Sequence, residues 1–174
     1  MNITKNIFIT FFILFSMQIN LNAELPHYVD FQKILNESTA GKKAQIELKS
    51  RLQQNIKQLN TRQKSLQEEE KKIIQQKKVL SVDDYKKKVA ILRKKVTSLQ
   101  KDRSESLQKI ANQRAKAKTQ ILKTLNPIIK DYMKKENIRM VINNKNLILA
   151  DEKLNITQNV MSLLNDKIKS IKLD

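Results

Sequence analysis

Residues 42–80 read KKAQIELKSRLQQNIKQLNTRQKSLQEEEKKIIQQKKVL, and this stretch decides the fold. A seven-residue apolar repeat keeps one side of a helix against a neighbouring helix. The second position of this repeat, which begins at Lys49, is apolar only at Ile56. The stretch therefore predicts a long helix whose narrow apolar stripe needs a partner. The residues of the stripe are Leu52, Leu59, Leu66, Ile73 and Leu80.

A second helix is predicted directly after the first. Ser81 is a suitable N-cap, and Asp84, three residues later, completes the arrangement of a capping box. Apolar residues then recur at four- and three-residue steps, starting at Tyr85. We therefore predict that residues 42–126 form an antiparallel helical hairpin, the arm, with its tip near residues 81–84. The residues expected to pack the arm are Leu52, Leu59, Leu66, Ile73, Leu80, Val89, Leu92, Val96 and Leu99.

Short strands are predicted on both sides of the arm. Residues 26–31 include β-branched and aromatic residues and predict a strand of about five residues, and residues 36–41 form a turn-like cluster. After the arm, Pro127 predicts a helix restart or a kink, with the helix running to about residue 136. Strands are then expected at 138–142 and 147–149. Thr157 is expected to cap a last amphipathic helix, whose apolar side holds Val160, Met161, Leu163, Leu164, Ile168 and Ile171.

The predicted fold class is therefore α+β and mainly α: a long helical hairpin on a small body that contains β-strands. The body would consist of residues 24–41 and 127–174. The chain has one Gly, one His and no Cys among 174 residues, so a Gly-rich phosphate loop, a disulfide framework and a zinc finger are not expected. We predict no enzyme activity, no catalytic or metal-binding residues and no cofactor.

The first 23 residues have the pattern of a secretory signal peptide. Lys5 precedes a short apolar run, and the small residue Ala23 follows it. The run of about 13 residues is shorter than the roughly 20 that cross a bilayer. We therefore predict cleavage after Ala23 and export to the periplasm. The alternative is an uncleaved membrane anchor.

The positive charge is predicted to lie on the arm. The whole chain carries a formal charge of +18, and residues 42–136 hold 27 Lys plus Arg against 10 Asp plus Glu. The remainder of the chain after Ala23 has seven basic and seven acidic residues. A field of this size attracts polyanions, acidic proteins or anionic membrane surfaces. The basic residues near the tip are Lys71, Lys72, Lys77, Lys78, Lys86, Lys87, Lys88, Arg93, Lys94 and Lys95.

The order of these parts resembles the Skp/OmpH family of periplasmic chaperones. Residues 28–36, YVDFQKILN, are similar to the opening segment of that family, and residues 137–143, NIRMVIN, to its later body. Residues 154–157, LNIT, resemble the entry to the last helix, with Asn155 where the family commonly has Asp. The resemblance covers residues 24–174.

The resemblance implies a homotrimer whose arms surround a cavity and hold unfolded outer-membrane proteins without ATP. The basic residues near the tip would then contact the client, and whether Tyr85 also does so is open. An anionic membrane surface or lipopolysaccharide is a further candidate partner. The main alternative is an exported coiled-coil protein that tethers the envelope without chaperone activity. Nucleic acid is not an expected partner, unless residues 1–23 fail to direct export.

Overall fold

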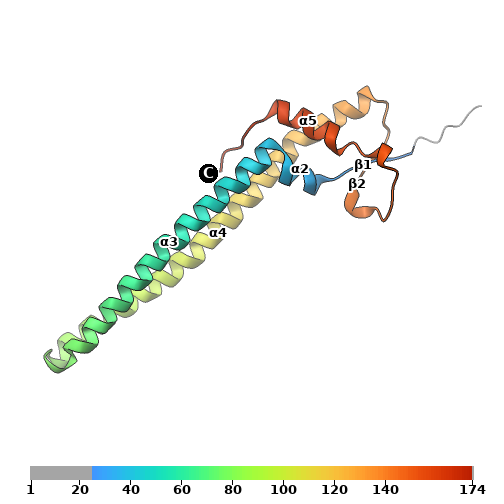
Figure 1. Cartoon of the computed structure of the whole chain (residues 1–174). Coiled ribbons are helices and arrows are strands. Elements are labelled where there is room, and N and C mark those ends of the chain that lie inside the picture. Colours follow the sequence, from blue (N-terminus) through green and yellow to red (C-terminus); the bar gives the residue numbers. More distant parts are fainter. Residues whose placement is uncertain (1–24, 174) are drawn as a thin grey trace, which may run out of the picture.

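The computed structural model describes residues 25–173, so the predicted signal peptide and its cleavage site after Ala23 lie outside the described residues. A long hairpin projects from a small body, which contains a two-stranded sheet (Figure 1). This confirms the predicted fold class, mainly α with a few strands. The elements are β1 (His27–Val29), α2 (Phe31–Glu37), α3 (Thr39–Gln75), η1 (Gln76–Lys78), α4 (Val82–Lys135), β2 (Val141–Asn143), η2 (Asn144–Asn146), η3 (Glu152–Leu154) and α5 (Thr157–Lys167).

The turn predicted at residues 36–41 is wrong, because α2 and α3 are separated by Ser38 alone. The Ser38 hydroxyl accepts a hydrogen bond from the Gly41 backbone N–H at 3.2 Å and so caps α3, which begins at Thr39, three residues before the predicted start. Gly41 lies inside the helix. A Cβ atom there would stand 2.1 Å from the Leu35 carbonyl oxygen, so glycine permits close contact between the two helices rather than a turn.

The tip of the arm lies earlier in the chain than the predicted residues 81–84, because residues 82–84 form the first turn of α4. Helix α3 ends at Gln75, five residues before the predicted end at Leu80, and η1 begins the reversal. The Ser81 hydroxyl accepts from the Asp84 N–H at 3.1 Å and donates to the Asp84 carboxylate at 2.6 Å. The predicted cap of the second helix at Ser81 is thus confirmed.

Helix α4 continues without interruption past Pro127, so the predicted helix restart is wrong. Proline inside a helix removes a backbone donor and costs roughly 3 kcal/mol. Burial of one large aliphatic side chain contributes roughly 1.5–3 kcal/mol. Leu125, Ile128 and Ile129 are all buried in the body when α4 continues, and their combined burial exceeds the cost of the proline.

The sheet joins the segment before the arm to the segment after it. Strand β1 pairs in parallel with β2, with Tyr28 opposite Ile142. On its other side, the Tyr28 carbonyl accepts from the Ile156 N–H at 3.0 Å. Burial and the nearby Glu152 carboxylate raise the pKa of the Tyr28 hydroxyl. The Tyr28 backbone therefore connects β2 on one side with the N-terminus of α5 on the other.

Only part of the predicted β-structure after the arm is present. The strand predicted at 138–142 is observed as β2, shifted to Val141–Asn143. The strand predicted at 147–149 is wrong for the single chain, because no strand is assigned there. Ile148 and Leu149 are both almost fully exposed. An isolated chain gives this segment no strand to pair with.

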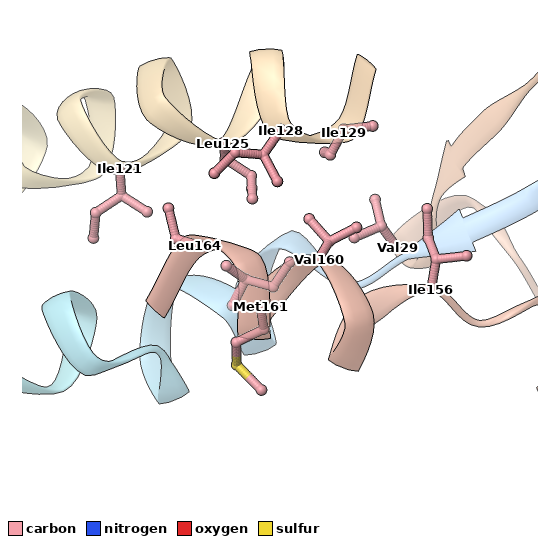
Figure 2. Packing of buried hydrophobic residues seen from close by; sticks show 10 residues of the cluster. Val29, Ile121, Leu125, Ile128, Ile129, Ile156, Val160, Met161 and Leu164 are labelled. Carbon is pink, nitrogen blue, oxygen red and sulfur yellow. The ribbon is translucent and has the colours of Figure 1, made fainter. Parts of the chain in front are cut away.

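The main core lies where α4 crosses α5 and β1 (Figure 2). Leu125 and Leu164 face each other there, and both have no exposed surface. Because α4 belongs to both the arm and the body, this cluster anchors the arm. Its buried members are Val29, Ile34, Ile121, Leu125, Ile128, Ile129, Ile156, Val160, Met161 and Leu164.

The prediction that Thr157 caps the last helix is wrong, because Thr157 is the first residue of α5 and Ile156 is its N-cap. The Thr157 hydroxyl instead accepts a hydrogen bond from the Asp30 backbone N–H at 2.9 Å. Of the residues expected on the apolar side of this helix, Leu163 is 43% exposed, and Ile168 and Ile171 lie beyond the helix end at Lys167.

Candidate functional site

The seam between α3 and α4 is a narrow apolar cluster. Leu66 and Ile73 of α3 pack with Leu92 and Leu99 of α4, and all four are buried. Other residues of the expected packing set contribute less. Leu59 and Val89 pack against the cluster while partly exposed, Leu52 and Leu80 are half-buried, and Val96 is 42% exposed. The buried part of the seam therefore lies in the half of each helix nearer the tip.

One side of the seam is closed by polar contacts between the helices, and we name it the bridged flank. Arg62 pairs with Asp102 and also donates to the Ser98 hydroxyl at 3.2 Å. One heptad nearer the tip, Lys95 donates to both oxygens of Glu69, at 2.7 and 2.8 Å. The last contact of the series joins Lys88 to Gln76 at 2.8 Å. The partners on each side of the seam are spaced by seven residues, from α3 into η1 on one side and along α4 on the other, so the bridges recur along one flank.

The opposite side of the seam is an open groove of about 720 Å³. Its floor is the apolar cluster of the seam, and the aliphatic side chains of Ile74 and Val96 lie beside it, 58% and 42% exposed. Gln100 is among its polar lining residues, and at the body end of the groove Arg103 donates a hydrogen bond to Gln63 of the other helix at 3.0 Å. We call this feature the open groove. Removal of its exposed aliphatic surface from water would be favourable for any ligand that covered it.

The basic residues near the tip lie mainly on the surface. Nine of the ten are exposed, and Lys88 is partly exposed. Three of them have a polar partner, and one of these pairs, at 2.9 Å between Lys71 and Glu68, holds the pKa of the Glu68 carboxyl below its usual value. The Lys77 ammonium lies 5.9 Å from the centre of the Tyr85 ring. Within the described chain, no carboxylate forms a salt bridge with Lys72, Lys78, Lys86, Lys87, Arg93 or Lys94.

The C-terminal segment ties the body to the root of the arm. After α5 the chain runs back along the arm (Figure 1), and Leu173 is buried against Ala44, Leu48 and Ala117. The Leu173 carbonyl accepts from Arg51 at 2.5 Å and from the Gln113 amide at 3.0 Å. Sequence patterns did not predict this contact, since residues 168–173 form no regular element and carry no motif.

Replacing Leu173 with Ala is expected to lower the free energy of unfolding by about 2 kcal/mol, because the aliphatic contacts at the arm root are lost. Urea denaturation followed by circular dichroism measures the change. The control is Ser170→Ala, which alters an exposed residue of the same segment. Equal stability of both variants and the wild type would mean that the segment does not restrain the arm.

The described residues hold no group of three or more His, Cys, Asp or Glu that would suit a metal ion. A helix with the length and hydropathy of a membrane span is also absent from the described part of the chain. The arm surface, with its open groove and basic tip, is therefore the candidate functional site.

Comparison with known proteins places these features in a family. A crystal structure from Caulobacter crescentus, of a candidate outer membrane chaperone (OmpH-like), superposes with a TM-score of 0.80 at 22% sequence identity. The alignment covers 86% of this chain and 90% of that one, which shows a shared fold. A search of curated proteins gave no significant match. The family model for outer membrane protein (OmpH-like) matches residues 27–164, most of the chain. The chain therefore belongs to the OmpH-like family.

Proposed function

We propose that this protein is a chaperone of the periplasm that holds unfolded outer-membrane proteins between basic helical arms, without ATP, and delivers them for membrane insertion. It is not proposed to be an enzyme. The observation that carries the proposal is the arm, a long hairpin with exposed basic residues and an exposed apolar groove on one flank. Family membership and the fold shared with an OmpH-like chaperone candidate support a chaperone-type role.

In this mechanism, the positive charge of the arm acts before contact with the client, and its exposed apolar surface acts after contact. The arm attracts acidic polypeptides over a distance through its positive field. Contact is then made by exposed aliphatic groups and by the aliphatic stems of Lys and Arg side chains. Many weak contacts of this kind retain an unfolded chain without imposing one conformation, so the client remains able to fold later.

Self-association as a homotrimer is part of the proposal. Met140, Ile148 and Leu149 are exposed beside the short strand β2, at 58%, 105% and 90%. A two-stranded sheet with three residues per strand is marginal by itself, and its free edge invites further strand pairing. A second copy that pairs with residues 147–149 would cover both the edge and the apolar side chains. In this proposal, residues 147–149 form a strand only in the trimer, where they pair with a second copy.

The test uses the protein from residue 24 onward and an unfolded outer-membrane β-barrel protein diluted from urea. We expect the mass in solution to correspond to three chains, and a complex with the barrel protein that prevents its aggregation. A monomer in both conditions, with no effect on aggregation, would contradict the proposal. A dimer that leaves aggregation unchanged would favour the envelope-tethering alternative.

Client capture is expected to slow about tenfold when salt rises from 50 to 500 mM, because the screening length falls from about 14 to about 4 Å. Stopped-flow fluorescence of a labelled barrel protein measures the capture rate. The control has glutamine in place of Lys72, Lys78, Lys86 and Lys87, all exposed. This variant should capture more slowly at low salt and respond less to salt. An unchanged rate in both proteins would exclude electrostatic steering.

A further inference from the structure

The two flanks of the arm differ in what they offer to a ligand. On the bridged flank, three successive polar contacts, Arg62–Asp102, Glu69–Lys95 and Gln76–Lys88, occupy groups that a ligand would otherwise use. The open groove has an apolar floor instead. A ligand on the bridged flank would have to displace these contacts. In the open groove the Arg103–Gln63 contact lies at the body end, and the apolar floor nearer the tip is left uncovered.

The polar groups at the open groove suit a polypeptide backbone. Gln67, Thr97 and Gln100 are exposed there, and side-chain amides both donate and accept hydrogen bonds. An unfolded chain carries one backbone donor and one acceptor at nearly every residue. Strands of outer-membrane barrels alternate apolar and polar side chains, so an extended segment can place its apolar side on the groove floor and its polar side in water.

We propose that the open groove is the surface on which the arm binds extended segments of unfolded outer-membrane proteins, with the bridged flank turned away from the client. This assignment rests on the proposed function and adds the face and the residues that perform it. The groove and its exposed flank continue toward the body through Ile56 and Leu107, which lie seven residues from Gln63 and Gln100 and are 46% and 55% exposed.

Charge identifies a client segment, rather than the arm of a second copy, as the occupant. Arg93 and Arg103 line the open groove, against the single acid Glu70. Residues 42–136 carry a net charge of +17, so two arms placed groove to groove repel each other. An acidic or neutral polypeptide meets no such repulsion. The groove therefore favours a client over self-association of the arms.

The experiment compares two positions on the same helix. A photo-reactive amino acid replaces Val96, which lines the open groove, or Ile91, which lies on the bridged flank and is 53% exposed. Ile91 is three residues from Lys88 and four from Lys95, so it shares their face. With an unfolded barrel protein as the probe, we expect at least fivefold more crosslinking from position 96. Equal yields, or more from position 91, would overturn the assignment.

A substitution experiment provides a second measurement. The variant Ile74→Ser with Val96→Ser should weaken client binding about tenfold, as expected for the loss of two aliphatic contacts. The control, Ile46→Ser with Ile91→Ser, removes two exposed aliphatic groups outside the groove and should bind as the wild type does. Melting curves of both variants verify that the arm remains folded, since all four residues are exposed.

The outcomes separate this inference from the proposed function. If the wild type prevents aggregation but both double variants bind the client equally well, the groove assignment fails and the proposed function stands. If the wild type holds no client, the proposed function fails first. Crosslinks between arms, increasing with protein concentration in the absence of a client, would show that a second copy occupies the groove.

Discussion

Replacing both Ile148 and Leu149 with Asp is expected to convert the proposed trimer into monomers. Both side chains are almost fully exposed in the single chain, yet they follow directly after β2 and η2. If a second copy covers them, each aliphatic side chain contributes roughly 1.5–3 kcal/mol by its burial. Aspartate loses this contribution and adds the cost of burying a charge. Multi-angle light scattering should therefore report one third of the wild-type mass.

The monomeric variant should also lose the ability to hold clients, because a single arm encloses no cavity. The control is Gln53→Asp with Gln54→Asp, which makes the same change in charge at exposed positions of α3. That variant should remain trimeric. A double variant that keeps the wild-type mass would show that residues 148 and 149 do not lie between copies, whether or not the protein is a trimer.

Replacing Leu125 with Ala is expected to lower the free energy of unfolding by about 3–4 kcal/mol. Leu125 has no exposed surface, and its side chain extends from α4 toward α5 in the body (Figure 2). The cavity would remain open, because the helices on both sides are held by other residues of the cluster. A loss of this size is a large part of the roughly 5–15 kcal/mol that stabilises a typical domain.

The measurement is urea denaturation at one fixed protein concentration, since the stability of an oligomer depends on concentration. Leu107→Ala is the matched control, because it removes the same atoms from the same helix at a position that is 55% exposed. It should cost less than about 0.5 kcal/mol. Equal effects of the two substitutions would mean that the body cluster does not anchor the arm.

The hairpin was predictable because its signals are local. The heptad series from Leu59 to Ile73, together with the cap at Ser81, specifies two helices and the place where the chain reverses. The polar bridges follow the same period. Their spacing is visible at Arg62, Glu69 and Gln76, although the sequence does not reveal which residues of the second helix meet them.

Two of the errors, at Gly41 and Pro127, arose because a residue with a strong local preference is used for packing. Gly41 has the signature of a turn, but it lies in α3 so that the Leu35 carbonyl can approach. Pro127 has the signature of a helix start, but it lies within α4 because its neighbours are buried. In both places the local preference amounts to a few kcal/mol or less, and tertiary contacts outweigh it.

The sequence by itself determined the basic helical arm, its approximate length and the neutral charge of the body, since helical period and charge are properties of the chain alone. Only the tertiary structure decided which flank of the arm is closed by ion pairs and which remains an open groove. It also decided that Leu173 packs against the arm root, 60 residues along the chain from Gln113. These contacts join segments far apart in the sequence, and their register depends on how the apolar seam packs.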